Sequence, residues 1–226
     1  MSAEVENLHT KDLTRTIVWV TLFSIAMGFL EAAVVIYLRE LYYPGGFVFP
    51  LTLMSNTNAV VELGREVATI IMLLGIGMLA GRNANQRLAY FVMSFAIWDI
   101  FYYVFLWLVL DWPQSIMEWD ILFLVPVLWV GPVITPLIIT ITMLLLSTVL
   151  LKSDVRLSKM EWTLLVIGSL VVILSWTLEF QQYSSSVGDP MKAVLTYVPQ
   201  KFPWIIFILG EIILLTPIYL FWRRTR

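Results

Sequence analysis

Residues 16–38 read TIVWVTLFSIAMGFLEAAVVIYL, an apolar stretch whose only charged residue is Glu31. A helix of roughly 20 apolar residues crosses a bilayer core about 30 Å thick. Five further stretches of this kind follow. Together they predict six transmembrane helices, at 16–38, 58–80, 88–110, 133–151, 162–182 and 204–222. The residues before the first stretch lack the basic start of a signal peptide, so we expect it to be a true membrane span.

The composition agrees with this pattern. The chain has 226 residues, of which 60% are hydrophobic and 13% charged, and its mean hydropathy is +0.86. Soluble domains are about half apolar and about a quarter charged. We therefore expect an all-α, polytopic membrane bundle. Its single transmembrane domain, residues 16–222, lies between a polar N-terminal tail, 1–15, and a basic C-terminal tail, 223–226.

Basic residues predict the orientation, because cytoplasmic loops carry an excess of Lys and Arg. If the N-terminus is cytoplasmic, the inner segments hold ten basic residues: Lys11, Arg15, Arg82, Arg87, Lys152, Arg156, Lys159, Arg223, Arg224 and Arg226. The outer segments then hold three, Arg39, Lys192 and Lys201, and Arg65 lies within a span. Both termini are therefore expected in the cytoplasm.

One part of the chain does not fit a regular span. Residues 121–151 carry no charge, and as one helix they would be about 46 Å long at 1.5 Å per residue. Prolines and a glycine interrupt the first half, at Pro126, Gly131, Pro132 and Pro136. We expect a proline-broken segment, interfacial or re-entrant, at 121–130, followed by a full fourth span.

The segment 190–198 is expected to form a small helix on the outer membrane face. Asp189 is a suitable N-cap, and Pro190 suits the first helical position. Pro199 ends the apolar run that follows.

Ionisable residues inside the predicted spans are the main candidates for function. Each costs at least about 2.5–3.5 kcal/mol on insertion scales. They are Glu31, Glu62, Arg65, Glu66, Asp99, Glu179 and Glu211. All the glutamates lie in the outer half of their spans and Asp99 lies near the midplane, so five different helices send acids toward one layer.

The spacing Glu62-x-x-Arg65-Glu66 places three side chains on one helix face, where Arg65 can bridge carboxylates. One reading is a structural ion-pair network. The other is an outward-facing polar site for a cation, proton or small ligand, formed by Glu31, Glu62, Arg65, Glu66, Asp99 and Glu211. The cofactor is unknown. If a metal binds, the candidate ligands are Glu31, Glu62, Glu66 and Glu211, which favour an oxygen-ligated divalent cation.

Asp99 is followed by Tyr102 and Tyr103, three and four residues on, and either phenol could bond its carboxyl. Two readings stay open for this acid: a proton-relay or gating group, and a neutral acid satisfied by a tyrosine. Glu179 is a secondary candidate, because Gln181 and Gln182 beside it indicate an exposed helix end.

Several chemistries are excluded. The chain has no cysteine, and its single histidine, His9, lies in the polar tail, so thiolate sites and bis-histidine haem are ruled out. No span contains a lysine for a retinal Schiff base, and no nucleotide-binding motif is present. The net charge of −2 gives no basic surface for nucleic acid.

Three functions remain after these exclusions. The leading one is transport or binding of a cation, a proton-coupled solute or a small ligand. The second is an accessory subunit of a larger membrane complex. The third is a membrane-embedded enzyme that uses carboxylates or a metal on a lipid-like substrate. The expected partners are membrane lipids, with other membrane subunits or further copies of the chain in a complex. The expected location is a prokaryotic plasma (inner) membrane.

Overall fold

The structure, a computed structural model, describes residues 2–153 and 155–226, with side chains from residue 12 onward. In these residues it contains seven helices and two short strands. The elements are α1 (Ser2–Tyr42), α2 (Asn56–Ala80), α3 (Ala84–Leu110), β1 (Trp119–Phe123), β2 (Trp129–Pro132), α4 (Ile134–Leu151), α5 (Lys159–Val187), α6 (Pro190–Thr196) and α7 (Trp204–Thr225). All the helices except α6 are long and apolar enough to cross a membrane, which confirms six membrane-length helices.

The first helix is longer than its predicted span. It begins at Ser2, so the backbone of the predicted polar tail continues directly into the first span. No glycine or proline interrupts residues 2–15, and nothing local therefore stops the helix. His9 lies in this part of α1, outside the described side chains. At the other end, α7 extends through Arg223 and Arg224 into the predicted basic tail.

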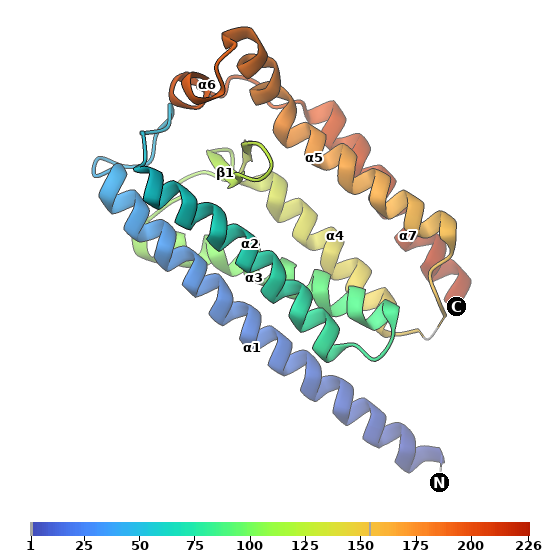
Figure 1. The fold of residues 1–226 in the computed structure, drawn as a ribbon. Coiled ribbons are helices and arrows are strands. Elements are labelled where there is room, and N and C mark those ends of the chain that lie inside the picture. Colours follow the sequence, from blue (N-terminus) through green and yellow to red (C-terminus); the bar gives the residue numbers. More distant parts are fainter. Residues whose placement is uncertain (1, 154) are drawn as a thin grey trace.

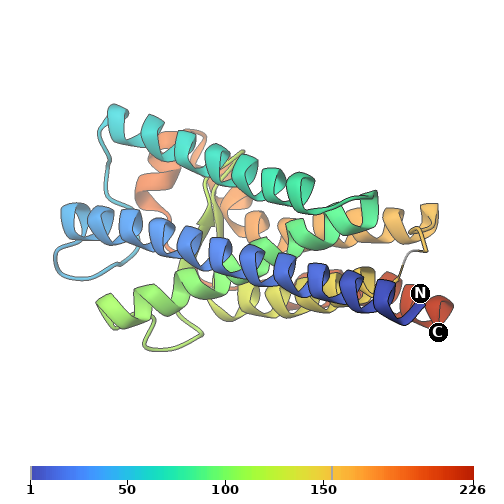
Figure 2. The same cartoon turned by 90° about the horizontal axis from the view of Figure 1, so that it is seen from below.

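The helices pack as two connected groups (Figure 1). One group has α3 packed against α1, α2 and α4, and the other is the pair α5 and α7. Contacts between α4 and α7 join them. Figure 2 shows both termini at one end of the bundle, as an even number of membrane crossings requires.

Glycines allow the closest helix contacts. A Cβ atom at Gly28 on α1 would lie 2.8 Å from the carbonyl oxygen of Trp98 on α3. A Cβ at Gly210 on α7 would lie 2.7 Å from a methyl group of Val172 on α5. Only the smallest residue lets these backbones approach so closely, as is common between membrane helices.

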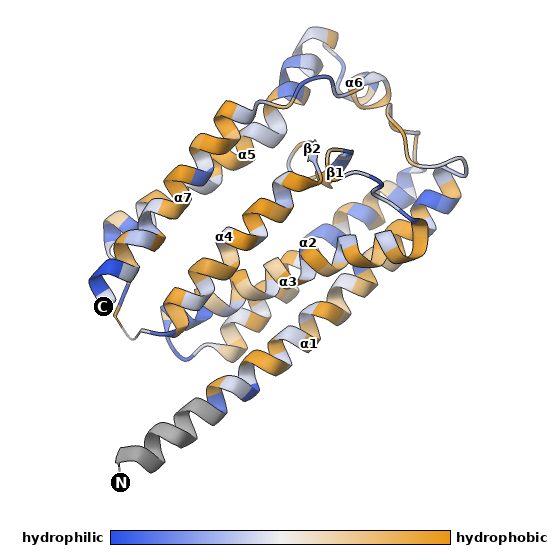
Figure 3. Ribbon diagram, turned by 180° about the vertical axis from the view of Figure 1, so that it is seen from behind, coloured by the Kyte–Doolittle hydropathy of each residue, from blue (hydrophilic) through white to orange (hydrophobic). Residues whose placement is uncertain are grey.

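The helices consist largely of apolar residues (Figure 3). Large apolar side chains on their outer faces, such as Leu79 on α2 and Ile205 on α7, are 87% and 85% exposed. In water such a surface would be unstable, whereas lipid chains cover it without cost. The structure therefore supports an integral membrane protein.

The all-α prediction needs one correction, at the proline-broken segment. Instead of an irregular piece at 121–130, β1 and β2 form an antiparallel hairpin, in which Asp120 lies opposite Gly131. The hairpin turn contains Pro126, which cannot donate a ladder hydrogen bond and is tolerated outside the strands. The hairpin pairs the inner edges of its two strands, and contacts from outside the ladder satisfy flanking groups, such as Glu66 at the Leu124 N–H and the Glu118 carbonyl at the Val133 N–H.

The helix predicted at 190–198 is present as α6, although it ends at Thr196. The Asp189 carboxylate accepts hydrogen bonds from the backbone N–H groups of Met191 and Lys192, at 2.9 and 3.1 Å. Pro190 occupies the first turn as expected. This helix lies at the end of the bundle away from the termini (Figure 1).

Candidate functional site

The first element of the site is the Arg65 group, which consists of Glu31, Glu62 and Arg65. Arg65 on α2 forms ion pairs with Glu62 on the same helix and with Glu31 on α1. Its Nε donates to Glu62 Oε2 at 3.0 Å, and Thr69 donates to Glu31 Oε2 at 3.2 Å. The predicted bridging of carboxylates by Arg65 is therefore present, and it joins α1 to α2.

Glu66 lies beside this group and has a different partner. Both of its carboxylate oxygens accept from the backbone N–H of Leu124, at 2.9 and 3.0 Å. Leu124 follows β1 directly, so a buried glutamate of α2 holds the hairpin turn. Glu66 also interacts electrostatically with Arg65, which places it at the edge of the Arg65 group.

The second element was missed by the sequence analysis. It is the Arg39 group, consisting of Arg39, Tyr103 and Asp120. Arg39 pairs with Asp120 at 3.3 Å, and the Tyr103 hydroxyl donates to the other Asp120 oxygen at 3.1 Å. Arg39 was counted only as a basic residue of the outer segments, whereas the structure shows it in the last turn of α1 and only 8% exposed.

Aromatic rings shield this ion pair. The Arg39 guanidinium lies 3.7 Å from the ring centre of Trp112 and 4.7 Å from that of Phe47, within cation–π range. Burial raises the pKa of Asp120, while the Arg39 charge and the Tyr103 hydrogen bond act in the opposite direction. The one sequence signal for this group was an acidic residue, Asp120, immediately before the long uncharged run.

Asp99 on α3 interacts electrostatically with Asp120 of the Arg39 group. It is 9% exposed, and its Oδ2 has no hydrogen-bond partner among the described residues. Of the two readings of Asp99, a neutral acid satisfied by a tyrosine does not hold for Tyr103, which donates to Asp120 instead, and the described residues show no hydrogen bond from Tyr102 to Asp99. The reason is a contact between distant parts of the chain. β1 brings the Asp120 carboxylate to α3, where it accepts the hydrogen bond of the Tyr103 phenol.

Tyr102 interacts with residues of both groups. It interacts electrostatically with a charged residue of each group, Arg65 and Asp120, and also with Asp99. Its ring contacts that of Tyr103, with centres 4.9 Å apart. Tyr102 is therefore within electrostatic range of both groups, and Asp99 is within range of Asp120 in the Arg39 group.

Glu211 has other partners. It lies on α7 and accepts from the Thr142 hydroxyl of α4 at 2.7 Å, while its Oε1 has no partner among the described residues. Within the chain that the structure describes, no three His, Asp or Glu side chains are arranged to hold a metal ion.

Glu179, the secondary candidate, holds a loop in place. Its carboxylate accepts from the Tyr197 hydroxyl at 3.0 Å and from the backbone N–H groups of Gln200 and Lys201, at 2.9 and 3.1 Å. Burial and the adjacent carboxylate raise the pKa of Tyr197, so its phenol stays a neutral donor. Glu179 therefore organises the segment between α6 and α7.

The comparisons with known proteins assign the chain to no family. Comparison with protein-family models, curated proteins and solved structures finds no match for the chain. Its function has to be argued from the geometry of its own residues.

Proposed function

We propose that the protein binds and exchanges protons within the membrane, as a proton-coupled transporter does, and that Asp99 is the proton-binding carboxyl. The observation that carries the proposal is the buried Asp99 Oδ2, which has no partner in the described part of the chain. Both arginines of the site are already paired, Arg65 with two glutamates and Arg39 with Asp120. An acid buried without a cation is far more stable with its proton bound.

The surroundings of Asp99 support exchange of that proton. Asp120 on β1 interacts electrostatically with Asp99, as do Tyr102 and Tyr103, which follow Asp99 by three and four residues on α3. Arg39 on α1 and Arg65 on α2 also interact electrostatically with Tyr102. Carboxyls and phenols in series are the groups from which membrane proteins build proton relays.

A proton fits the site better than a metal ion. Of the four glutamates considered as metal ligands, Glu31 and Glu62 pair with Arg65, and Glu66 accepts from Leu124. Glu211 bonds to Thr142 on another pair of helices. A divalent cation needs six or more oxygen ligands, whereas a proton needs one.

The proposed orientation places both termini in the cytoplasm and α6 outside. The positive-inside rule supports it, because the described inner segments hold most of the lysines and arginines. The proposed location is a prokaryotic plasma membrane. The Arg65 group then lies in the half of the membrane facing outward.

A proton-binding titration tests the function. Purified wild-type protein and Asp99→Asn are titrated in the same detergent, and the protons bound per chain at neutral pH are compared. We expect the wild type to hold one proton more. Glu40→Gln, which removes an exposed acid of α1, serves as the control and should not change proton binding at neutral pH. Equal proton binding by wild type and Asp99→Asn would overturn the proposal.

A further inference from the structure

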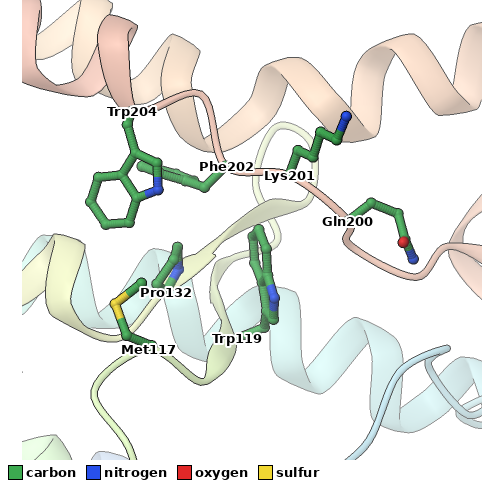
Figure 4. Close-up of a pocket in the computed structure, with 7 residues that line it drawn as sticks. All are labelled: Met117, Trp119, Pro132, Gln200, Lys201, Phe202 and Trp204. Atoms are coloured by element: carbon green, nitrogen blue, oxygen red, sulfur yellow. The ribbon is translucent and has the colours of Figure 1, made fainter.

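Two pockets lie next to each other at the end of the bundle that carries α6. The aromatic pocket has a volume of about 380 Å³, and its walls come from the hairpin region and the start of α7 (Figure 4). The polar pocket has a volume of about 530 Å³ and lies over the last turns of α5. Gln200 lines both, so they adjoin at this residue. Both volumes fall in the range of small-molecule sites.

The walls of the two pockets differ in chemistry. In the aromatic pocket, Trp119, Phe202 and Trp204 lie around Met117 and Pro132, and Lys201 and Gln200 complete the wall on the side of the polar pocket (Figure 4). The polar pocket is lined by amides, hydroxyls and phenols, including Gln182, Tyr183, Thr196 and Gln200, with Glu179 as its one charged group. An amphiphile with an apolar part and an uncharged polar part matches this division.

The pockets also lie at the right level of the membrane. The 29 residues of α5 make a helix about 43 Å long, longer than the apolar core of about 30 Å. Its last turns, from Glu179 to Ser186, are rich in polar residues and so belong to the headgroup region. Trp204 begins an apolar span, the position at which tryptophan lies at the membrane interface.

The donors and acceptors indicate the headgroup. No lysine or arginine lines the polar pocket, and the nearest cation of the site, Lys201, lines the aromatic pocket instead, so the polar pocket itself offers a phosphate no charge partner. Amides and hydroxyls both donate and accept, as a sugar hydroxyl does. The wall of the polar pocket is preformed, because the Glu179 carboxylate accepts hydrogen bonds from the Tyr197 hydroxyl and from the backbone N–H groups of Gln200 and Lys201. A fixed polar wall discriminates strongly for ligands that carry the matching hydroxyls.

We infer that these adjoining pockets bind a lipid with an uncharged, polyhydroxylated headgroup, a glycolipid, from the leaflet at the α6 end. The apolar portion contacts Trp119, Phe202 and Trp204, and the headgroup hydroxyls bond to the amides and hydroxyls of the polar pocket. This site is separate from the proton site at Asp99, and neither inference depends on the other.

Native mass spectrometry tests this binding. The full chain, purified in a detergent without a sugar headgroup, is mixed with glucosyl diacylglycerol, phosphatidylglycerol and diacylglycerol of identical acyl chains. We expect the glucosyl lipid to be retained in preference to the other two. Gln182→Ala should weaken its retention roughly two- to tenfold, the effect of one neutral hydrogen bond.

Two further variants make the test decisive. Gln181→Ala is the matched control, because Gln181 is exposed beside Gln182 and does not line the pocket; its retention should equal that of the wild type. Lys201→Gln should also leave glucosyl lipid retention unchanged. Preferential retention of phosphatidylglycerol, if Lys201→Gln abolishes it, would overturn the proposal. Binding of methyl glucoside, which has no acyl chain, as strongly as the glucosyl lipid would also overturn it.

Discussion

Arg39 on α1 and Asp120 on β1 are 81 positions apart in the sequence and form an ion pair of 3.3 Å in which both side chains are buried. The pair fixes the hairpin against the first helix, and Tyr103 on α3 bonds to the same carboxylate. Three elements therefore meet at one carboxyl group, next to Asp99.

Removing one member of this pair should strongly destabilise the protein. Arg39→Met leaves the Asp120 charge buried, and Asp120→Asn leaves the Arg39 charge buried, each at a cost of about 3–5 kcal/mol. The double variant should lose less than the sum of the two, with a coupling energy of about 0.5–3 kcal/mol. Unfolding in mixed micelles measures these free energies. Strictly additive losses would show that the two charges do not interact.

The pH dependence of stability should also report on Asp120. Because burial raises its pKa above the ordinary 3.8, the folded state holds this proton more tightly than the unfolded chain. Taken alone, the contribution of Asp120 to stability is therefore greatest at low pH and falls as the pH rises through the folded value, because the burial of this carboxyl outweighs its attraction to Arg39. We expect Tm to fall more steeply with rising pH, from about pH 4 upward, in the wild type than in Asp120→Asn. Arg39, Tyr103 and Asp99 face the same carboxyl, and parallel profiles for the two proteins would assign the decline to other groups.

Glu66 should control the hairpin turn without being required for helix formation. Glu66→Ala leaves the Leu124 N–H without its acceptor, a loss of about 1–3 kcal/mol, whereas Glu66→Gln keeps an acceptor oxygen. We expect faster hydrogen exchange across residues 119–132 in the alanine variant and nearly wild-type exchange in the glutamine variant. If Glu66→Ala leaves exchange in this segment unchanged, the hairpin is held by other contacts.

The absence of cysteine allows a direct test of orientation. Lys152→Cys follows α4, and Lys192→Cys lies in α6; both positions are exposed. In intact cells a membrane-impermeant maleimide should label the Lys192 variant and leave the Lys152 variant unlabelled until the membrane is opened. The reverse pattern would place the termini outside.

The sequence predicted the helices well and the site in part, for a physical reason. Long apolar stretches such as 16–38 carry their own signal, because spanning a bilayer depends on length and apolarity alone. Likewise, Glu62 and Arg65 are close in sequence on one helix, so local spacing sufficed to predict their contact.

The missed features depend on contacts between distant residues. Nothing local to Arg39 indicates Asp120, and an uncharged run containing Pro126 and Gly131 does not distinguish a hairpin from an irregular piece. The sequence analysis also grouped Glu211 with Glu31, because both were expected at the same depth in the membrane. Helix packing instead places Glu211 against Thr142 on α4.

The most direct test of the account is infrared difference spectroscopy of the Asp99 carboxyl at neutral pH. A protonated carboxylic acid has a C=O stretching band that a carboxylate lacks. We predict that the wild-type spectrum contains such a band, that Asp99→Asn removes one component of it, and that Glu40→Gln leaves it intact. Retention of the complete carboxylic acid signal in Asp99→Asn would contradict the assignment of Asp99 as the buried proton-binding group.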